Sequence, residues 1–71
     1  MKIFNQSKDA IINMPRDIWT TCCGENYMVV CSSNQGTYLG QYKTKERADE
    51  VLAEIFQAYR AKKNSYCVPK E

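Results

Sequence analysis

Four cysteines are the residues of this chain that most readily do chemistry: Cys22, Cys23, Cys31 and Cys67. They could hold a metal ion, form disulfides or supply a nucleophile. However, no Cys-x-x-Cys pair occurs, the spacings match no known zinc arrangement, and the chain has no histidine to act as metal ligand or general base. Adjacent Cys22 and Cys23 on a strand would point to opposite faces, so they could not pair with one partner. We therefore expect reduced thiols, no metal, no cofactor and no catalytic residue, and hence a protein that is not an enzyme.

Cations and aromatic rings form the second set of candidate residues. A nucleotide site needs cationic groups for the phosphates and a ring for the base. The candidates for ligand binding are Arg16, Trp19, Tyr27, Tyr38, Arg60 and Lys63. Each also has a structural interpretation, because rings on strands can fill a core or an oligomer interface and cations at a helix C-terminus complement the helix dipole. The sequence leaves both interpretations open.

One helix is expected in the C-terminal half of the chain. Thr44 is a good N-cap residue, and the apolar residues that follow it recur at helical spacing. The predicted buried stripe consists of Ala48, Val51, Leu52, Ile55, Phe56 and Tyr59. A stripe on one side of a helix needs a surface to cover, so we expect this helix to pack on a sheet.

Short β-rich runs separated by polar turns predict that sheet. The runs 2–5 and 10–14 flank a first turn at 6–9, and the runs 18–22 and 27–32 flank a second turn that contains Gly24. The turn at 33–36 contains Gly36, and the last run is 37–42. Gly40, inside that run, marks either a bulge or a close approach of another backbone.

The predicted fold class is therefore α+β: a small antiparallel sheet of about five short strands, arranged as a meander, packed against one C-terminal amphipathic helix. Residues 1–64 form the domain and 65–71 a C-terminal tail. Alternation predicts that Ile3, Ile11, Ile18, Val29 and Leu39 face the helix. The opposite face would then carry Phe4, Ile12, Trp19, Met28, Val30, Tyr38 and Tyr42. A face this apolar should not stay in water, which predicts a homodimer or higher oligomer, another partner or a ligand.

Length and charge narrow the function classes. A chain of 71 residues buries only a small core, so association with copies of itself would help its stability. A formal charge of +2 is far from the basic surface of a nucleic-acid-binding protein, which disfavours a nucleic acid as partner. No apolar run reaches the ~20 residues that cross a bilayer, and no hydrophobic segment follows Met1. We expect no membrane partner and a location in the cytoplasm.

Two segments of the chain resemble small phage and prophage proteins. The first, MKIFNQSKDAIINM, is similar to the start of many such proteins, and the second, YLGQYKTKERADEVLAEIFQAY, resembles their ending, in which Leu-Gly-x-Tyr-x-Thr precedes a helix. The resemblance covers about half of the chain and concerns size and layout. Phage proteins of this kind include cyclic-nucleotide sponges, such as anti-Thoeris proteins, and inhibitors that bind a defence protein directly.

The resemblance implies a phage-type accessory protein that counteracts host defence in the cytoplasm of the host cell. The first hypothesis is a homo-oligomer that sequesters a nucleotide-derived signalling molecule. The alternative is an inhibitor that binds a host defence protein directly through an exposed sheet face or edge. A small transcriptional regulator is a weaker interpretation, because the chain has no helix-turn-helix pattern and little positive charge.

Overall fold

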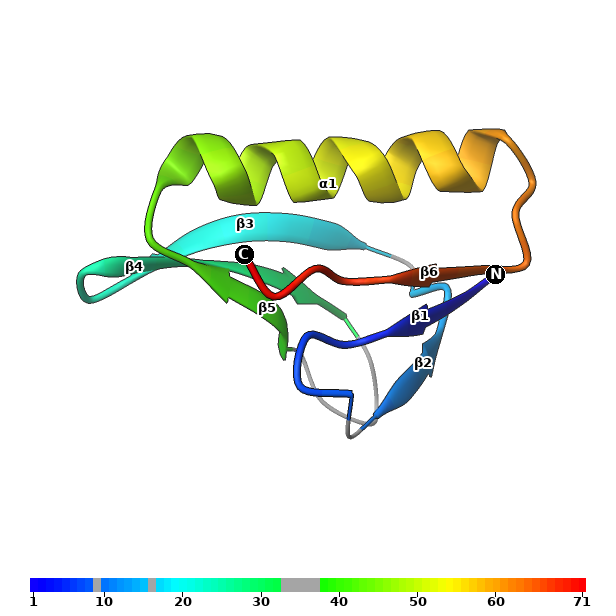
Figure 1. The fold of residues 1–71 in the computed structure, drawn as a ribbon, viewed down its shortest axis with the longest axis horizontal. Coiled ribbons are helices and arrows are strands. Elements are labelled where there is room, and N and C mark those ends of the chain that lie inside the picture. The colour runs from blue at the N-terminus through cyan, green and yellow to red at the C-terminus, as the bar shows by residue number, and fades with distance from the viewer. Residues whose placement is uncertain (9, 16, 33–37) are drawn as a thin grey trace.

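In the part of the chain that the structure describes, the fold consists of six short strands in two small sheets and a single helix, and it is α+β as predicted (Figure 1). The computed structural model describes residues 1–8, 10–15, 17–32 and 38–71. The first sheet has the order β2-β1-β6 and the second the order β3-β4-β5. The strands are β1 (Lys2–Phe4), β2 (Ile11–Asn13), β3 (Ile18–Cys23), β4 (Asn26–Cys31), β5 (Tyr38–Tyr42) and β6 (Ser65–Cys67), and the helix α1 spans Lys45–Arg60.

The prediction of a single five-stranded meander needs correction. A sixth strand, β6, lies in the segment that was expected to be a tail, and it pairs in parallel with β1. The partners are Lys2 with Ser65 and Phe4 with Cys67, at opposite ends of the sequence. A strand of three residues has no clear periodicity of its own, and its pairing depends on a partner that lies about 60 residues away in the chain. Local sequence patterns therefore do not reveal it.

Both predicted hairpins are present. In the first, β1 and β2 are antiparallel, and the Asn5 side-chain oxygen accepts a hydrogen bond from the Ala10 amide at 3.2 Å. In the second, β3 and β4 pair from Ile18 with Cys31 to Cys23 with Asn26. The two-residue loop between them begins with Gly24 at a φ of +62°, which a glycine adopts without strain. The predicted turn at 33–36 and residue 37 of the last predicted strand lie outside the described residues.

Gly40 lies at the predicted bulge, and the atoms that approach it belong to side chains and not to another backbone. The register between β4 and β5 shifts between Val29 and Val30, opposite Gly40 and Tyr38, which marks a bulge. A Cβ atom on Gly40 would also lie 2.9 Å from the Tyr42 hydroxyl oxygen and 2.9 Å from Cγ1 of Val68. The missing side chain therefore lets the segment after β6 approach β5 closely.

The helix begins as predicted and buries a narrower stripe than predicted. The Thr44 hydroxyl accepts the Arg47 amide at 3.2 Å, so Thr44 is the N-cap. The buried helix residues are Ala48, Val51, Ile55 and Ala58. Phe56 and Tyr59 were expected in the stripe and instead expose 55% and 54% of their surface. The buried side of the helix instead includes Ala58, which was not among the residues of the predicted stripe.

The assignment of the sheet faces also changes. Ile12 is buried and Ile11 is 54% exposed, the reverse of the prediction, because Ile12 pairs with buried Ile3. Val30 and Tyr42 were placed on a second, uncovered apolar face and are both buried. Of that predicted face, Trp19 keeps the greatest exposure, at 45%. The core thus takes up three of the seven residues that were expected to need a partner, namely Ile12, Val30 and Tyr42.

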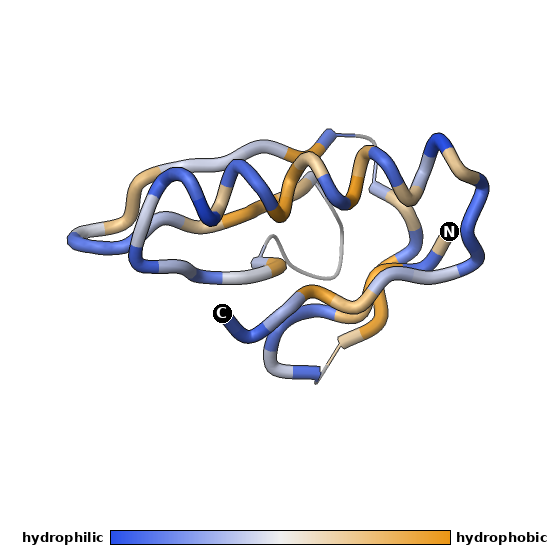
Figure 2. The backbone as a smooth tube through the Cα atoms, turned by 45° about the horizontal axis from the view of Figure 1, so that its top comes forward, coloured by the Kyte–Doolittle hydropathy of each residue, from blue (hydrophilic) through white to orange (hydrophobic). Residues whose placement is uncertain are grey.

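The core lies between α1 and the sheets, and the apolar segments of α1 alternate with polar ones along the tube in Figure 2. Its largest fully buried side chains are Ile3, Leu39, Ile55, Val29, Val51, Val68 and Cys31. Among the residues that the structure describes, no helix is long and apolar enough to cross a membrane.

Candidate ligand-binding surfaces

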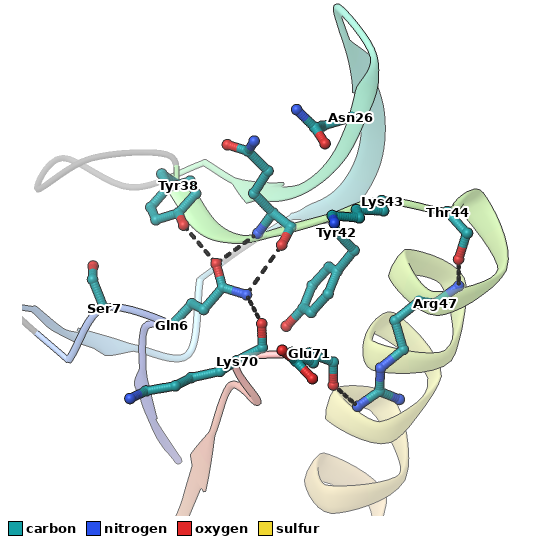
Figure 3. A pocket seen from close by; sticks show the side chains of 11 residues that line it. Gln6, Ser7, Asn26, Tyr38, Tyr42, Lys43, Thr44, Arg47, Lys70 and Glu71 are labelled. Carbon is teal, nitrogen blue, oxygen red and sulfur yellow. Dashed lines mark hydrogen bonds between the residues drawn. The ribbon is translucent and has the colours of Figure 1, made fainter.

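Two surface pockets contain cations and aromatic rings together. The larger pocket, which we call the C-terminal groove, has a volume of about 770 Å³ and lies between β5, the start of α1 and the end of the chain (Figure 3). The smaller, with about 520 Å³, surrounds the C-terminal end of α1. The two can be compared by asking how many of their polar groups already have partners within the protein.

Gln6 is the centre of the C-terminal groove. Its side-chain amide donates hydrogen bonds to the carbonyl oxygens of Lys70 at 2.8 Å, Gln41 at 3.1 Å and Pro69 at 3.2 Å. Its side-chain oxygen accepts from the Tyr38 hydroxyl at 2.7 Å and from the Gln41 amide at 3.0 Å. The Gln6 side chain, drawn in Figure 3 with its bonds to Tyr38, Gln41 and Lys70, thus connects the segment after β1, the strand β5 and the chain's last residues. Its bonding capacity is used within the fold.

Tyr42 and Arg47 close the other side of the C-terminal groove. The Tyr42 hydroxyl donates to the Pro69 carbonyl at 2.6 Å, and the Arg47 guanidinium donates to the backbone oxygen of Glu71 at 2.6 Å. Arg47 also lies 3.7 Å from an Oε atom of Glu54 and 5.9 Å from the centre of the Tyr42 ring. Burial raises the pKa of Tyr42 to about 12, although the nearby positive charge of Arg47 acts in the opposite direction. The tyrosine therefore keeps its proton, and its hydrogen bond, at neutral pH.

Ionisable side chains on the helix surface beside this groove are bonded to neighbouring side chains. The Tyr66 hydroxyl donates to Glu54 at 2.6 Å, and the pKa of Tyr66 is raised, first by burial and then by this bond to a carboxylate. At the helix start, Lys45 and Asp49 form an exposed ion pair of 2.8 Å, and this hydrogen bond lowers the pKa of Asp49. Most polar groups of the C-terminal groove thus bond to other parts of the fold. Among the described residues, Lys43 and Lys70 are the cations of its lining that form no ion pair.

The smaller pocket differs because its charges lack carboxylate partners. We call it the basic-aromatic patch, and its lining consists of Met1, Phe56, Tyr59, Arg60, Lys62, Lys63 and Asn64. Within the described part of the chain, no carboxylate lies within ion-pair distance of Arg60, Lys62 or Lys63. The Arg60 guanidinium carbon lies 5.6 Å from the centre of the Phe56 ring, within the range of a cation–π contact. Three cations and two half-exposed rings therefore occupy one surface.

The backbone at the end of α1 explains how these cations are gathered. The Lys63 amide donates to the Ala58 carbonyl and the Lys62 amide to the Tyr59 carbonyl, both at 3.1 Å, which is the Schellman pattern of helix termination. This pattern puts Lys62 at a φ of +58°, where glycine is the usual residue and other residues cost roughly 1–2 kcal/mol. The sharp end of the helix thus brings Lys62 and its neighbour Lys63 into one pocket with Arg60.

The six residues predicted for ligand binding do not form one site in a single copy. Arg60 and Lys63 lie together in the basic-aromatic patch, Tyr38 lies in the C-terminal groove, and Tyr27 is half-buried on β4 against the core. Trp19 is exposed on β3 and lines neither pocket. Arg16 lies outside the described residues. The rings beside the cations are Phe56 and Tyr59, which the sequence pattern had assigned to the core.

The cysteines are free thiols, with Cys31 buried and the other three exposed. Burial raises the pKa of the Cys31 thiol, which favours its neutral form. Among the described residues, no three potential ligands of the Cys, Asp and Glu type lie close enough to hold a metal ion. Comparison with known protein families, with curated protein sequences and with solved structures finds no match to this chain.

Proposed function

We propose that this protein binds a phosphate-bearing, nucleotide-derived signalling molecule on the basic-aromatic patch, and that it acts by sequestering the molecule as a homo-oligomer. The observation that carries this proposal is the group of three cations without carboxylate partners beside two exposed rings. Phosphate oxygens accept charge-assisted hydrogen bonds from Arg and Lys, and an aromatic ring can stack on a base. In the biological setting implied by the resemblance to phage proteins, sequestration would counteract a host defence.

The balance of charges supports the patch over the C-terminal groove. A ligand in the groove would have to compete with hydrogen bonds that already join Gln6, Tyr42 and Arg47 to the end of the chain. A ligand on the patch would gain its contacts without breaking an ion pair of Arg60, Lys62 or Lys63. The cations also complement the dipole at the helix C-terminus, but that effect is worth about 0.3–1 kcal/mol at an exposed site and needs no aromatic ring.

The proposal is tested by native mass spectrometry and calorimetry with a panel of linear and cyclic nucleotides and with a deproteinised lysate of defence-activated cells. We expect a discrete added mass on the wild-type protein. The variant Arg60→Gln/Lys63→Gln should bind the same ligand at least tenfold more weakly, because a hydrogen bond to a charged group contributes roughly 1.5–3 kcal/mol. Phe56→Leu keeps an apolar side chain, removes the ring and should weaken binding of a base-containing ligand.

A matched control is Lys45→Gln, which removes a charge at the opposite end of the same helix. It should bind like the wild type. Equal losses in Lys45→Gln and in the patch variants would show a general charge effect and contradict a site on the patch. A protein that gains no mass from any nucleotide or lysate would favour the alternative, direct binding to a host defence protein.

A further inference from the structure

The open edge of β3 offers backbone hydrogen-bonding groups in a regular array. β3 is the terminal strand of the sheet β3-β4-β5, and only its β4 side is paired. Just before β3, the Ser32 amide donates to the Asp17 carbonyl at 2.9 Å, so Asp17 and Ser32 are a hydrogen-bonded pair of the antiparallel ladder. Such pairs occur at every second residue. Trp19, Thr21 and Cys23 therefore direct their backbone groups toward β4, and Ile18, Thr20 and Cys22 direct theirs to the open edge.

These outward groups have no partner within the described residues, since the hydrogen bonds outside the ladders include no backbone atom of Ile18, Thr20 or Cys22. The helix does not close the edge, because α1 lies on the face of the sheet, where Asp49 accepts a hydrogen bond from the Thr20 hydroxyl at 3.3 Å. In Figure 2, β3 runs along the upper border of the molecule, beyond α1. A further strand could therefore approach β3 in the plane of the sheet.

The side chains of β3 carry none of the features that usually protect an edge. Its sequence, Ile-Trp-Thr-Thr-Cys-Cys, has no charged residue and no proline over six residues. Exposed edges of soluble proteins are usually short, charged, bulged or interrupted by proline, because an open, neutral edge pairs with other strands. Of the other outer strands, β2 and β6 are only three residues long, and the outer side of β5 is bonded to Gln6 through Leu39 and Gln41. β3 is thus the edge best suited to strand pairing.

We propose that β3 pairs with β3 of a second copy, antiparallel, about a two-fold axis that passes beside Thr20. The proposal deepens the proposed function, which includes a homo-oligomer, by naming its interface. In this register Thr20 lies opposite Thr20 of the second copy and Ile18 opposite Cys22 of the second copy. All these residues direct their backbone groups outward, so each such pair exchanges two hydrogen bonds. The two three-stranded sheets become one continuous sheet.

Two features favour this register and a second copy as the occupant: the outward residues Ile18, Thr20 and Cys22 all pair with one another, and like charges stay apart. Asp17 and Glu25 flank β3 at its two ends. In a register centred on Thr21, Asp17 would face Glu25 of the second copy, and two carboxylates would oppose each other. In the register centred on Thr20, Asp17 faces Cys23 and Glu25 faces Pro15 of the second copy, so no like charges meet. A neutral strand with acidic residues only at its ends is thereby compatible with its own copy.

The same register covers the exposed tryptophan. Thr20 points toward α1, so Trp19 points to the opposite face of the sheet, where Thr21 of the second copy becomes its neighbour. Trp19 is the single tryptophan of the chain, and its fluorescence therefore reports on the interface. Its emission should shift to shorter wavelength as the protein concentration rises and the dimer forms.

The test combines sedimentation equilibrium with a tryptophan fluorescence dilution series on the wild type and three variants. Thr20→Pro removes an amide that points away from β4, so it blocks the edge and spares the β3–β4 ladder. Thr20→Lys puts a cation opposite its own copy in the dimer, yet beside Asp49 within each monomer. The control Gln57→Lys adds the same charge on the exposed side of α1. We expect a wild-type dimer, an unchanged control, and a dimer dissociation constant raised at least tenfold by either Thr20 variant.

The Thr20 variants must remain folded by circular dichroism for this comparison, and Thr20→Lys serves where Thr20→Pro does not fold. A monomeric wild type at about 100 µM, or a Thr20→Lys protein that dimerises like the wild type, would overturn the proposal. A stable pairing of β3 with a strand of another protein, without self-association, would overturn it too. Nucleotide binding is measured separately on the basic-aromatic patch: a monomer that still binds nucleotide refutes only this interface, and a dimer that binds none refutes only the proposed ligand.

Discussion

At the scale of single residues, Gly40 is the position where the lack of a side chain matters most. We predict that Gly40→Ala lowers the free energy of unfolding by about 1–3 kcal/mol, the usual cost of overpacking. The added Cβ would lie 2.9 Å from the Tyr42 hydroxyl oxygen, which is itself held by Pro69, and 2.9 Å from Val68. Chemical denaturation of the variant and the wild type measures the loss.

A double-mutant cycle identifies the cause of this loss. In the Val68→Ala background the methyl group nearest to the new Cβ is gone, so Gly40→Ala should cost measurably less there. Strictly additive effects of the two changes would show that contact with Val68 does not limit the site. Gly24 behaves differently: a Cβ there meets nothing within 4 Å, and only its φ of +62° requires glycine.

At the scale of the elements, the orientation of α1 can be tested with two neighbouring residues. Ile55 is fully buried and Phe56 is half-exposed, although both were predicted in one stripe. We predict that Ile55→Ala lowers the free energy of unfolding by about 2–5 kcal/mol, since it opens a cavity in the core. Phe56→Ala should cost less than about 1 kcal/mol, because a surface residue loses mainly its contact with Arg60. The reverse order in denaturation experiments would mean that the helix is rotated.

The elements also show which features of the fold local sequence patterns can predict. The helix, its Thr44 cap, both hairpins and the bulge at Gly40 follow from signals within a few neighbouring residues, and all are present. The exposure of Phe56 and Tyr59 does not follow from such signals, since it depends on which side of α1 the sheet covers. β6 depends on β1, and the basic-aromatic patch depends on a helix end. The patch contained two predicted residues, Arg60 and Lys63, but its rings were assigned to the core.

At the scale of the whole molecule, one side chain connects segments that are far apart in the sequence. Gln6 bonds to β5 through Gln41 and Tyr38 and to the end of the chain through Pro69 and Lys70. We predict that Gln6→Ala lowers the free energy of unfolding by about 2 kcal/mol, because several partners lose a hydrogen bond at once, and the bonds to Tyr38 and Pro69 are partly buried. Gln41→Ala is the matched control, since only the backbone of Gln41 takes part in these bonds.

Hydrogen exchange distinguishes a loosened connection from a general loss of stability. In Gln6→Ala, the amide of Gln41 loses its direct acceptor, so it should exchange faster than the change in global stability explains. The amide of Val68 donates to Phe4 in the same region and should follow it, whereas amides within the β3–β4 hairpin should change only with global stability. Uniform acceleration across the whole chain would contradict this role. It would mean that the two sheets and the chain's end unfold as one unit, with Gln6 as one contact among many.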